Sequence, residues 1–557
     1  MSKCYQHQCR NGKSLKFFSN SLVTSSQYHF PKQVDPNLAS ILLNPEKISD
    51  IRFSHKHKKI FLGFGGKHPS NIYRYPVWIP VDTLFSHILV GGSIGSGKST
   101  LITRLLAGSL NCGLTAVIGE AKSDMEINPQ AAAFSRLTPY LSNHFGIQSY
   151  RWTRGNCYFN PLLYLANLSA RKTFLNSIVK QINGIEGELK GWVYGAADIG
   201  AYILELLYTI SYTPELQEQV CTLRKLLDLI REPEQVEMLI DFGLKHDDKN
   251  KHKINEIKRK LGWANFFNLK TPGGREKFAM TLKGINLFAD MLDEEDLLYY
   301  SEPHTKDKKG NPLVKLELDD ILYNQALVVI SQPLAANHPS AKIVGAIFWD
   351  ALLNYTLSMG LNPPSKNGKQ RQGLAVFLDE THRLPVGSLG DAGDFLREFK
   401  IGLIEITPAV VDQERWNKNK HVYQTIISIS PGVPEVCNLI HERLSENTKP
   451  PLEIDIGIKL NAQKSIEIQP HIIDNRRQQT NYNDPGVSVR ALRNTGQYTA
   501  LLYTDTIRDG AGLFWLDLEN SILANLQNLL EDANAGDKTA AKLVAYALGL
   551  TPEFVRD

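Results

Sequence analysis

The sequence lacks the features that define several large classes of protein. It has six cysteines in 557 residues, at positions 4, 9, 112, 157, 221 and 437, and this spacing gives no disulfide framework and favours a reducing compartment. No stretch approaches the roughly 18 uncharged apolar residues that a membrane-spanning helix needs. The N-terminus also has no apolar segment of signal-peptide length. We therefore expect a cytoplasmic protein with no direct membrane span, peripheral at the inner membrane only through its partners.

The sequence also has little excess of positive over negative charge, since the formal net charge is only +4. Any surface that binds nucleic acid must therefore be local. Cys4 and Cys9 flank His7, but no second pair of metal ligands lies nearby, so we interpret this segment as a tail rather than a metal site. The best candidate for a membrane helix, IVGAIFWDALL from Ile343, is short and carries Asp350, which favours a buried helix. An apolar content of 42% with 22% charged residues is typical of a globular protein.

Short apolar runs bounded by Gly, Pro or polar residues predict a series of buried strands. The runs that we interpret as strands are 60–66, 75–81, 87–90, 114–118, 325–331, 373–380, 401–407, 425–430 and 498–504. A helix is expected to begin at Lys98, because Leu101, Leu105 and Leu106 follow at helical spacing. The order strand, glycine-rich turn, helix, strand is the beginning of a parallel α/β sheet.

The middle of the chain has a different pattern. Residues from about Leu163 to Lys270 are rich in Leu, Glu and Lys at helical spacing and contain no convincing strand. We therefore predict one α/β core that is interrupted by an inserted all-α domain. The expected boundaries are 1–55 for an N-terminal tail, 56–162 and 273–520 for the two parts of the nucleotide-binding domain, 163–272 for the insertion and 521–557 for a C-terminal helical tail.

The stretch GGSIGSGKST, residues 91–100, contains the pattern G-x-x-x-x-G-K-[ST] of a phosphate-binding loop. Its glycines let backbone N–H groups turn toward phosphates, and the N-terminus of the next helix adds positive potential. Lys98 is predicted to reach the β and γ phosphates, and the Ser99 hydroxyl to ligate Mg²⁺. The predicted nucleotide-binding residues are Gly92, Ser93, Ile94, Gly95, Ser96, Gly97, Lys98, Ser99 and Thr100.

An apolar strand that ends in two carboxylates, LAVFLDE, is the expected partner of this loop. Asp379 would hold Mg²⁺ through water, and Glu380 would polarise the attacking water, as in motor ATPases. A GTPase would carry N-K-x-D after a later strand, and NKNK at Asn417 lacks the Asp. A small kinase would not need the about 280 residues between Ser99 and Asp379. Loops that long are rarely structureless, so the insertion is expected to fold.

Several segments together resemble a known family. HILVGGSIGSGKSTL, with its leading His87, resembles the P-loop of the type IV secretion coupling proteins, the TraG/TraD-like branch of the FtsK/HerA motor ATPases. VIGEAKSDM is similar to that family's D-P-K-G-D segment, with Glu120 in place of Asp and with Lys122 and Asp124 retained. The other similar segments, within a resemblance that covers about 60–520, are FNPL at 159–162, MTLKGINLFADMLDEEDLLYYSE, LELDDILYNQALVVISQPLA, FLDETHRLP and HVYQTIISISPGVPEVCNLIHERL.

The resemblance implies a RecA-like P-loop core, binding of ATP and Mg²⁺, and a ring of subunits, expected to be a homo-hexamer. Two departures matter. Family members commonly have N-terminal membrane helices, whereas we detect none. The strand after the D-E motif usually ends in a Gln that senses the γ-phosphate, whereas Thr407 and Pro408 stand there in this chain. Thr407 could still offer a hydroxyl; Gln413, which lies nearby in sequence, is a weak substitute.

Motors of this type place an arginine from the neighbouring subunit against the reacting phosphate. Arg397 is the leading candidate for this role and Arg383 a weaker one; the alternative for Arg397 is an arginine on a helix surface. For DNA, the polar loop after the sensor strand brings Arg415, Lys418 and Lys420 together beside a tryptophan, although a solvated loop explains them as well.

A second cluster of charge, 245–260, has seven Lys or Arg against three acids. Ile254, Ile257 and Leu261 give it an apolar helical stripe, so its charges are expected to form a solvated face, with contact to DNA or the relaxosome as the alternative.

The sequence thus predicts an ATP-hydrolysing DNA translocase that links DNA, carried by a relaxase in a relaxosome, to a type IV secretion channel in conjugative transfer of a plasmid or integrative element. Two alternatives stay open: an ATPase that recruits effector proteins to the channel, and a scaffold that binds ATP without turning it over.

Overall fold

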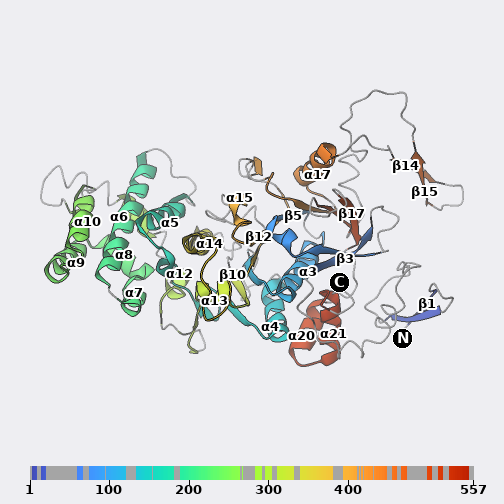
Figure 1. Cartoon of the computed structure of the whole chain (residues 1–557), viewed down its shortest axis with the longest axis horizontal. Coiled ribbons are helices and arrows are strands. Elements are labelled where there is room, and N and C mark those ends of the chain that lie inside the picture. The colour runs from blue at the N-terminus through green and yellow to red at the C-terminus, as the bar shows by residue number, and fades with distance from the viewer. Residues whose placement is uncertain are drawn as a thin grey trace, which may run out of the picture. The chain divides into compact units, whose positions relative to one another are not determined.

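The protein folds into two compact units in a computed structural model (Figure 1). The first unit is made of Met1–Gly108 and Ile404–Asp557, and the second unit is made of Ser109–Leu403. The structure describes residues 3–8, 14–19, 59–66, 75–93, 96–120, 133–153, 155–180, 188–211, 213–263, 266–267, 283–290, 295–303, 306, 310–331, 339–379, 393–409, 413, 416–417, 420–430, 432–447, 454–460, 466–472, 499–504, 512–517 and 526–550.

The first unit contains a mixed sheet with strand order β4-β3-β17-β16-β13-β5-β12. The central strand β5 pairs in parallel with β13 and β12, and the remaining neighbours pair antiparallel. Buried parallel strands read as continuous apolar runs, and β5, β12 and β13 are buried over their whole length. The strands are β3 (Lys59–Gly66), β4 (Tyr75–Pro80), β5 (Ile88–Gly92), β12 (Ile401–Thr407), β13 (Thr425–Ile429), β16 (Thr499–Thr504) and β17 (Gly512–Asp517).

Five helices of the first unit are described along their whole length. They are α2 (Asp82–Phe85), α3 (Lys98–Asn111), α17 (Pro434–Asn447), α20 (Leu526–Asn534) and α21 (Lys538–Ala547); the end of α3 runs into the second unit. Two antiparallel hairpins also lie in this part of the chain: β1 (Lys3–Gln8) with β2 (Ser14–Ser19), and β14 (Ile454–Leu460) with β15 (Ile466–Ile472).

The second unit contains a sheet of parallel strands in the order β11-β6-β10-β7-β8-β9. Because parallel strands run the same way, all their carboxyl ends lie at one edge of the sheet, which is where α/β proteins usually place their sites. The strands are β6 (Thr115–Glu120), β7 (Gln148–Trp152), β8 (Cys157–Tyr158), β9 (Val314–Lys315), β10 (Ala326–Ser331) and β11 (Leu374–Leu378).

Helices make up the rest of the second unit. Between 168 and 263 the described residues form helices and turns and no strand. The helices are α4 (Ala133–Phe145), the 3₁₀ helix η3 (Pro161–Tyr164), α5 (Leu168–Lys180), α6 (Glu188–Ile210), α7 (Pro214–Val220), α8 (Leu223–Arg231), α9 (Pro233–His246), α10 (Lys251–Trp263), a helix at 283–290, α12 (Glu295–Tyr299), α13 (Leu318–Tyr323), α14 (Pro339–Met359) and α15 (Gly393–Leu396).

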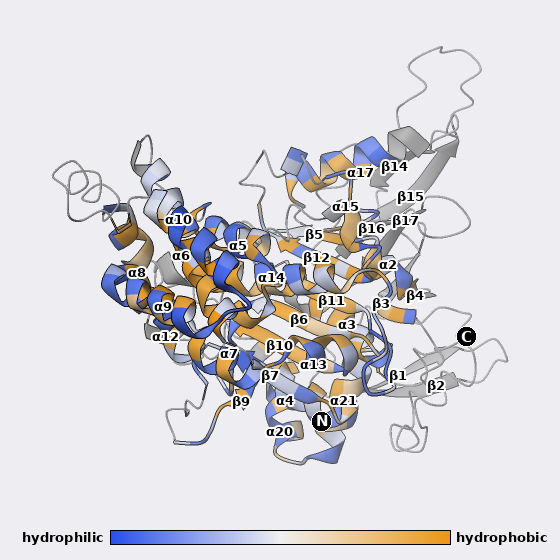
Figure 2. Ribbon diagram, turned by 60° about the vertical axis from the view of Figure 1, so that its left-hand side comes forward, coloured by the Kyte–Doolittle hydropathy of each residue, from blue (hydrophilic) through white to orange (hydrophobic). Residues whose placement is uncertain are grey.

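The helices and the sheet of the second unit share one hydrophobic core. Its buried side chains run from Val117 and Val328 on the strands to Leu226 and Ile257 on the helices. The strands β6, β10 and β11 are hydrophobic along their length, whereas polar residues lie on the outer faces of α7 and α9 (Figure 2). The helical insertion is therefore packed on the sheet by apolar contacts and is not held by its connections alone.

The α/β class, the mostly parallel pairing around the P-loop strand and the helical insertion are confirmed, and each expected strand is present. Several strands were not predicted. The apolar run of β17 and the alternating pattern of β14 and β15 were overlooked. The hairpin β1–β2 lies in a polar segment, β8 and β9 have two residues each, and β7 alternates in burial and begins at an exposed Gln148. The predicted boundaries of the nucleotide-binding domain, the insertion and the tails stay a prediction, because the two compact units are defined by contacts and not by these boundaries.

One described helical stretch, Lys190–Ile210, is long and apolar enough to cross a membrane by length and composition. However, 67% of its most apolar window is buried inside the structure, and it carries Asp198 and Glu205. The shorter apolar run from Ile343 is part of α14 and is buried through Leu353, as expected for a core helix.

Candidate functional site

The glycine-rich loop connects the end of β5 to the beginning of α3 in the first unit. Gly97, directly before α3, has a φ of 95°, a left-handed conformation that favours glycine. A Cβ on Gly92 would lie 2.6 Å from the Ser96 Oγ and 3.1 Å from the Ile429 carbonyl oxygen. Both glycines of the motif are therefore required by the backbone path and by the neighbouring strand β13.

Lys98 is the first residue of α3, and its side chain points back into the loop. It is 7% exposed, and its ammonium donates hydrogen bonds of 2.7 Å to the carbonyl oxygens of Gly92 and Ser93. The Ser96 hydroxyl is buried and has no hydrogen-bond partner among the described residues. The loop thus surrounds a buried ammonium and a buried hydroxyl at the N-terminus of a helix, and this donor set suits the oxygens of a phosphate group.

The rest of the predicted loop is only partly covered by the structure. Ile94 and Gly95 lie outside the described residues, and so do the side chains of Ser99 and Thr100. The predicted Mg²⁺ ligation by Ser99 therefore stays a prediction.

His87 sets the direction in which the chain enters β5. Its φ of 57° is left-handed, which costs a residue with a side chain about 1–3 kcal/mol. Its N–H donates to the Leu84 carbonyl at 3.1 Å, and its own carbonyl accepts from the Thr425 N–H at 3.4 Å. The strand that leads into the phosphate loop is thus anchored to α2 on one side and to β13 on the other.

Thr407 lies beside the loop, because the β12–β5 register pairs it with Gly91. It is 5% exposed, and its hydroxyl accepts a hydrogen bond from the Ala409 N–H at 3.3 Å and donates to the Ala409 carbonyl. The Thr407 hydroxyl is therefore part of a tight local turn. Gln413, the weak substitute for a sensor, is exposed.

Glu405, on the same strand, is a residue that sequence reasoning missed. It is 4% exposed and pairs in register with Leu89 of β5. A carboxylate inside the apolar run IGLIEIT was the available signal, since buried acids are rare without a partner or a function.

Asp379 follows β11 at the carboxyl-end edge of the second unit. It is 5% exposed, and its N–H donates to the Gly119 carbonyl of β6 at 3.1 Å. Glu120 and Ser331 pair in register at the ends of β6 and β10, so all three lie at the same edge of the sheet. Arg151 of β7 joins them, since its Nε donates to the Ser331 Oγ at 2.9 Å.

The carboxylate of Glu120 is itself engaged at this edge. It is 1% exposed, and its Oε1 accepts from the N–H of Phe134, in the first turn of α4, at 3.3 Å. A carboxylate is favoured at the N-terminal end of a helix.

Three other predicted residues of this edge lie outside the described residues: Glu380, Lys122 and Asp124. Asp379 belongs to the second unit and the phosphate loop to the first, so the Mg²⁺ bridge between Asp379 and Ser99 stays a prediction.

Arg397 lies in the exposed turn between α15 and β12. The turn is closed by a hydrogen bond of 2.9 Å from the Lys400 N–H to the Arg397 carbonyl, and the Lys400 carbonyl accepts from the Leu374 N–H at the start of β11. Arg397 thus lies at the amino-terminal edge of the sheet, the length of β11, about 16 Å at 3.3 Å per residue, from Asp379. Arg397 and Asp379 of one chain are therefore not brought together. An arginine that acts on the nucleotide of a neighbouring subunit does not need to lie near Asp379 of its own chain. Arg383 lies outside the described residues.

Of the three predicted DNA contacts, only Lys420 is described. It lies 3.5 Å from Glu442 of α17 in an ion pair, and its N–H donates to the Trp416 carbonyl at 2.8 Å. Arg415 and Lys418 lie outside the described residues.

The cluster 245–260 forms the end of α9 and most of α10, and its apolar stripe faces the core as expected. Three of its lysines are in ion pairs, each with a different acid. The pairs are Lys251 with Asp248 at 2.5 Å, Lys253 with Glu205 at 2.5 Å and Lys258 with Asp241 at 3.1 Å.

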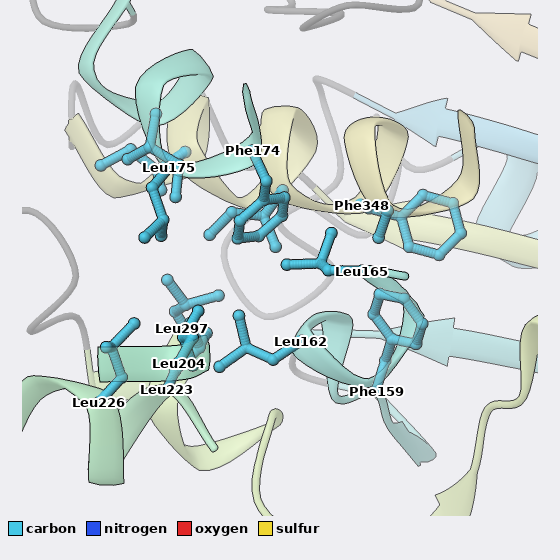
Figure 3. Close-up of a cluster of buried hydrophobic side chains, with 14 of the residues drawn as sticks. Phe159, Leu162, Leu165, Phe174, Leu175, Leu204, Leu223, Leu226, Leu297 and Phe348 are labelled. Carbon is cyan, nitrogen blue, oxygen red and sulfur yellow. The ribbon is translucent and has the colours of Figure 1, made fainter. Parts of the chain in front are cut away.

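The N-P-L turn joins the sheet of the second unit to the helical insertion. The Asn160 Oδ1 accepts from the Leu162 N–H at 3.1 Å and so begins η3, while its Nδ2 donates to the Cys221 carbonyl at 2.9 Å. Figure 3 shows Phe159, Leu162 and Leu165 pointing into one cluster of buried side chains from several helices. The motif therefore has a structural function, namely to anchor the insertion.

The structure describes the side chains of four cysteines, at 112, 157, 221 and 437, and these four are free thiols. Burial raises the pKa of the Cys221 thiol to about 12, and burial also raises the pKa of Cys157 well above its usual range. Neither is activated as a nucleophile, since that requires a lowered pKa. No group of three or more His, Cys, Asp or Glu could hold a metal ion among the side chains that the structure describes.

Comparison with known proteins gives structural likeness only. No family model matches the chain, and no curated protein matches it. Solved structures of the bacterial conjugative coupling protein TrwB align with 83% of this chain and 95% of theirs in the unbound form (14% identity, TM-score 0.48). For the complex with ADP and Mg²⁺ the shares are 85% and 96% (14% identity, TM-score 0.46).

A second type of protein is also similar in structure. VirB4 of Thermoanaerobacter pseudethanolicus aligns with 66% of this chain and 83% of its own, at 11% identity and a TM-score of 0.35. The chain is thus similar to a conjugative coupling protein and to VirB4, and with TM-scores below 0.5 its family stays a proposal.

Proposed function

We propose that this chain is an ATPase that binds ATP and Mg²⁺ at the loop Gly92–Thr100. The observation that carries the proposal is the buried ammonium of Lys98, held inside a glycine loop at the N-terminus of α3. A lysine in this position neutralises phosphate charge, and helix N-termini bind phosphate groups. The Gly92 position, where any side chain would fill the loop, supports the same use.

The remaining roles follow the sequence motifs. Ser99 and Asp379 would hold Mg²⁺, which draws charge from the β and γ phosphates when bound. Glu380 would accept a hydrogen bond from the attacking water and orient it, and Arg397 would act on the nucleotide of a neighbouring subunit. Arg397 is exposed, which suits a residue that contacts a neighbouring subunit.

The biological function that we propose is that of a type IV secretion coupling protein. A ring, expected to be a hexamer, would use ATP to move DNA delivered by a relaxase toward the secretion channel. The residues that would contact the DNA backbone are Arg415, Lys418 and Lys420. The segments that resemble the TraG/TraD-like motors support this proposal, as does the spacing between the loop and the Asp379–Glu380 pair.

The test is the rate of ATP hydrolysis with and without single- and double-stranded DNA, read together with the mass of the assembly. Lys98→Ala is expected to abolish hydrolysis, while Lys190→Ala, which changes an exposed lysine of α6, leaves it unchanged. A Lys98→Ala variant that hydrolyses ATP at the wild-type rate contradicts the site assignment. Hydrolysis that neither form of DNA stimulates favours protein effectors as the cargo.

One observation favours the scaffold alternative. The hydroxyl that stands in for the sensor Gln, that of Thr407, is engaged in a turn with Ala409. Release of phosphate over many turnovers would exclude a scaffold that binds ATP without hydrolysing it.

A further inference from the structure

Arg104 is a buried arginine on α3, the helix that begins with Lys98. Its side chain is 2% exposed and connects segments that are far apart in the sequence. Nε donates to the Ala547 carbonyl at 3.1 Å, and Nη1 donates to the Leu62 carbonyl at 3.0 Å. The guanidinium carbon lies 5.4 Å from the centre of the Phe61 ring. One side chain thus joins α3, β3 and the end of α21.

The C-terminal helices α20 and α21 form a hairpin (Figure 1), and the end of α21 makes this contact. We name α20 and α21, residues 526–547, the C-terminal hairpin. The Asp537 carboxylate caps α21 by accepting from the N–H groups of Thr539 and Ala540 at 2.7 and 3.1 Å. Ala547 is the last residue of α21, and a cation is favoured at the carbonyl end of a helix. Arg104 therefore binds the hairpin where the helix dipole attracts it.

The packing around Arg104 leaves little room for sliding. A Cβ on Gly108 of α3 would lie 2.5 Å from the Ile60 Cγ2 of β3. A Cβ on Gly549, two residues after the hairpin, would lie 2.6 Å from the Phe61 Cδ1. Because α3 and the segment that follows the hairpin both press against β3 at neighbouring residues, a displacement of the hairpin must move the Arg104 side chain or break its hydrogen bonds.

We infer that Arg104 is a positioning residue that couples the docking of the C-terminal hairpin to nucleotide binding at the start of α3. The inference rests on the proposed function, since it concerns the same phosphate loop. Arg104 lies six residues after Lys98 on the same helix, less than two turns away, so a shift of α3 at Arg104 would also move Lys98. Coupling of this kind is reciprocal: if the docked hairpin favours nucleotide, then nucleotide favours the docked hairpin.

The first test measures the dissociation constant of a fluorescent ATP analogue for the full-length chain. Arg104→Gln is expected to weaken binding by about tenfold, within the usual range of coupling between sites. Arg104→Lys keeps one charged donor and should fall between that variant and the wild type. Arg443→Gln is the matched control, because the Arg443 Nη2 donates to the His421 carbonyl at 3.1 Å in the same unit, and it should bind normally.

A second pair of variants acts on the hairpin and leaves α3 unchanged. Gly549→Ala places a methyl group against Phe61 and should weaken nucleotide binding as Arg104→Gln does. Gly536→Ala is its control: Gly536 also has a left-handed φ, 102° against 71° at Gly549, but its Cβ would meet nothing within 4 Å. This control carries the backbone strain without the contact, so its nucleotide affinity should stay close to that of the wild type.

Hydrogen exchange of the wild-type chain completes the test even if a variant fails to fold. Addition of ATP should slow the exchange of amides in 538–550, and Arg104→Gln should remove this effect while the far-ultraviolet circular dichroism stays native. The coupling is refuted if the wild type and all variants bind the analogue equally well and ATP leaves the exchange of 538–550 unchanged. The nucleotide site is not contradicted by that result. If the wild type binds no nucleotide, the proposed function fails and the inference fails with it.

Discussion

Glu205 of α6 should be the residue of the helical insertion whose loss is most damaging to local stability. It accepts a hydrogen bond from the Arg171 guanidinium of α5, and its Oε1 lies 2.5 Å from the Lys253 ammonium of α10. The Arg171 and Glu205 side chains are 5% and 9% exposed. The guanidinium carbon of Arg171 lies 3.9 Å from the centre of the Tyr208 ring. One carboxylate therefore holds three helices together through two cations.

The substitution Glu205→Gln keeps the volume and removes the charge. Breaking a buried ion pair by changing one partner leaves the other charge uncompensated, which costs about 3–5 kcal/mol. Lys253 is 49% exposed, so it can turn to water, and its share should be less than about 1 kcal/mol. Most of the expected loss therefore comes from Arg171, which is buried against Tyr208.

Native-state hydrogen exchange is the appropriate assay, because it measures the opening of individual helices. A loss of about 3 kcal/mol should speed exchange in α5, α6 and α10 by roughly a hundredfold, at tenfold for each 1.4 kcal/mol. Asp241→Asn is the control, since the Asp241 side chain is 64% exposed in its ion pair with Lys258 and should change opening by about 0.5 kcal/mol or less. If Glu205→Gln changes exchange no more than Asp241→Asn, the argument from the buried pair is wrong.

Three other predictions concern stability and the thiols. Gly195→Ala, where a Cβ would meet nothing within 4 Å, should stabilise α6 by about 0.5–1 kcal/mol in urea unfolding, whereas Gly108→Ala should destabilise by about 1–2 kcal/mol because of its contact with β3. Burial raises the pKa of the Cys221 thiol to about 12 in the folded protein, against about 8.5 in the unfolded chain. The contribution of this thiol to folding stability is therefore fully present below about pH 8.5 and is lost as the pH rises toward 12. The wild type should therefore lose about 2 kcal/mol more than Cys221→Ala between pH 8 and pH 10, and equal losses would contradict this. In the native protein iodoacetamide should label the half-buried Cys112 before Cys157, as read by peptide mass spectrometry; labelling of Cys157 at the same rate would show that the β8 region opens readily.

Local patterns allowed most of the fold to be predicted. The strands β5, β6, β10, β11, β12 and β13 are mostly apolar and buried along their whole length, as a parallel sheet requires because both faces of each strand are covered. The apolar stripe of Ile254, Ile257 and Leu261 was likewise visible from helical spacing alone. Polar or two-residue strands such as β7, β8 and β9 give no such signal, because their pairing depends on neighbours that are distant in the sequence.

The sequence did not reveal which buried charged residues join distant elements, and the cause is the same in each case. Arg104 was one arginine in an ordinary helix until Ala547, 443 residues away, was seen to accept its hydrogen bond. Glu205 was one acid in an apolar helix, and its partners come from two other helices. Hydrogen bonds and ion pairs of this kind form between elements that the chain brings together only on folding, so no local pattern encodes them.

The sequence by itself determined the phosphate loop, the carboxylates that follow β11 and the order of the elements, because each depends on residues within about ten positions of one another. Only the tertiary structure decided that Lys98 points into the loop and that the Thr407 hydroxyl is engaged in a turn. It also decided that Arg104 of α3 donates a hydrogen bond to the Ala547 carbonyl at the end of the C-terminal hairpin. The physical reason is the cost of burial: a buried charge or hydroxyl needs a partner, and the folded chain alone determines which partner is within reach.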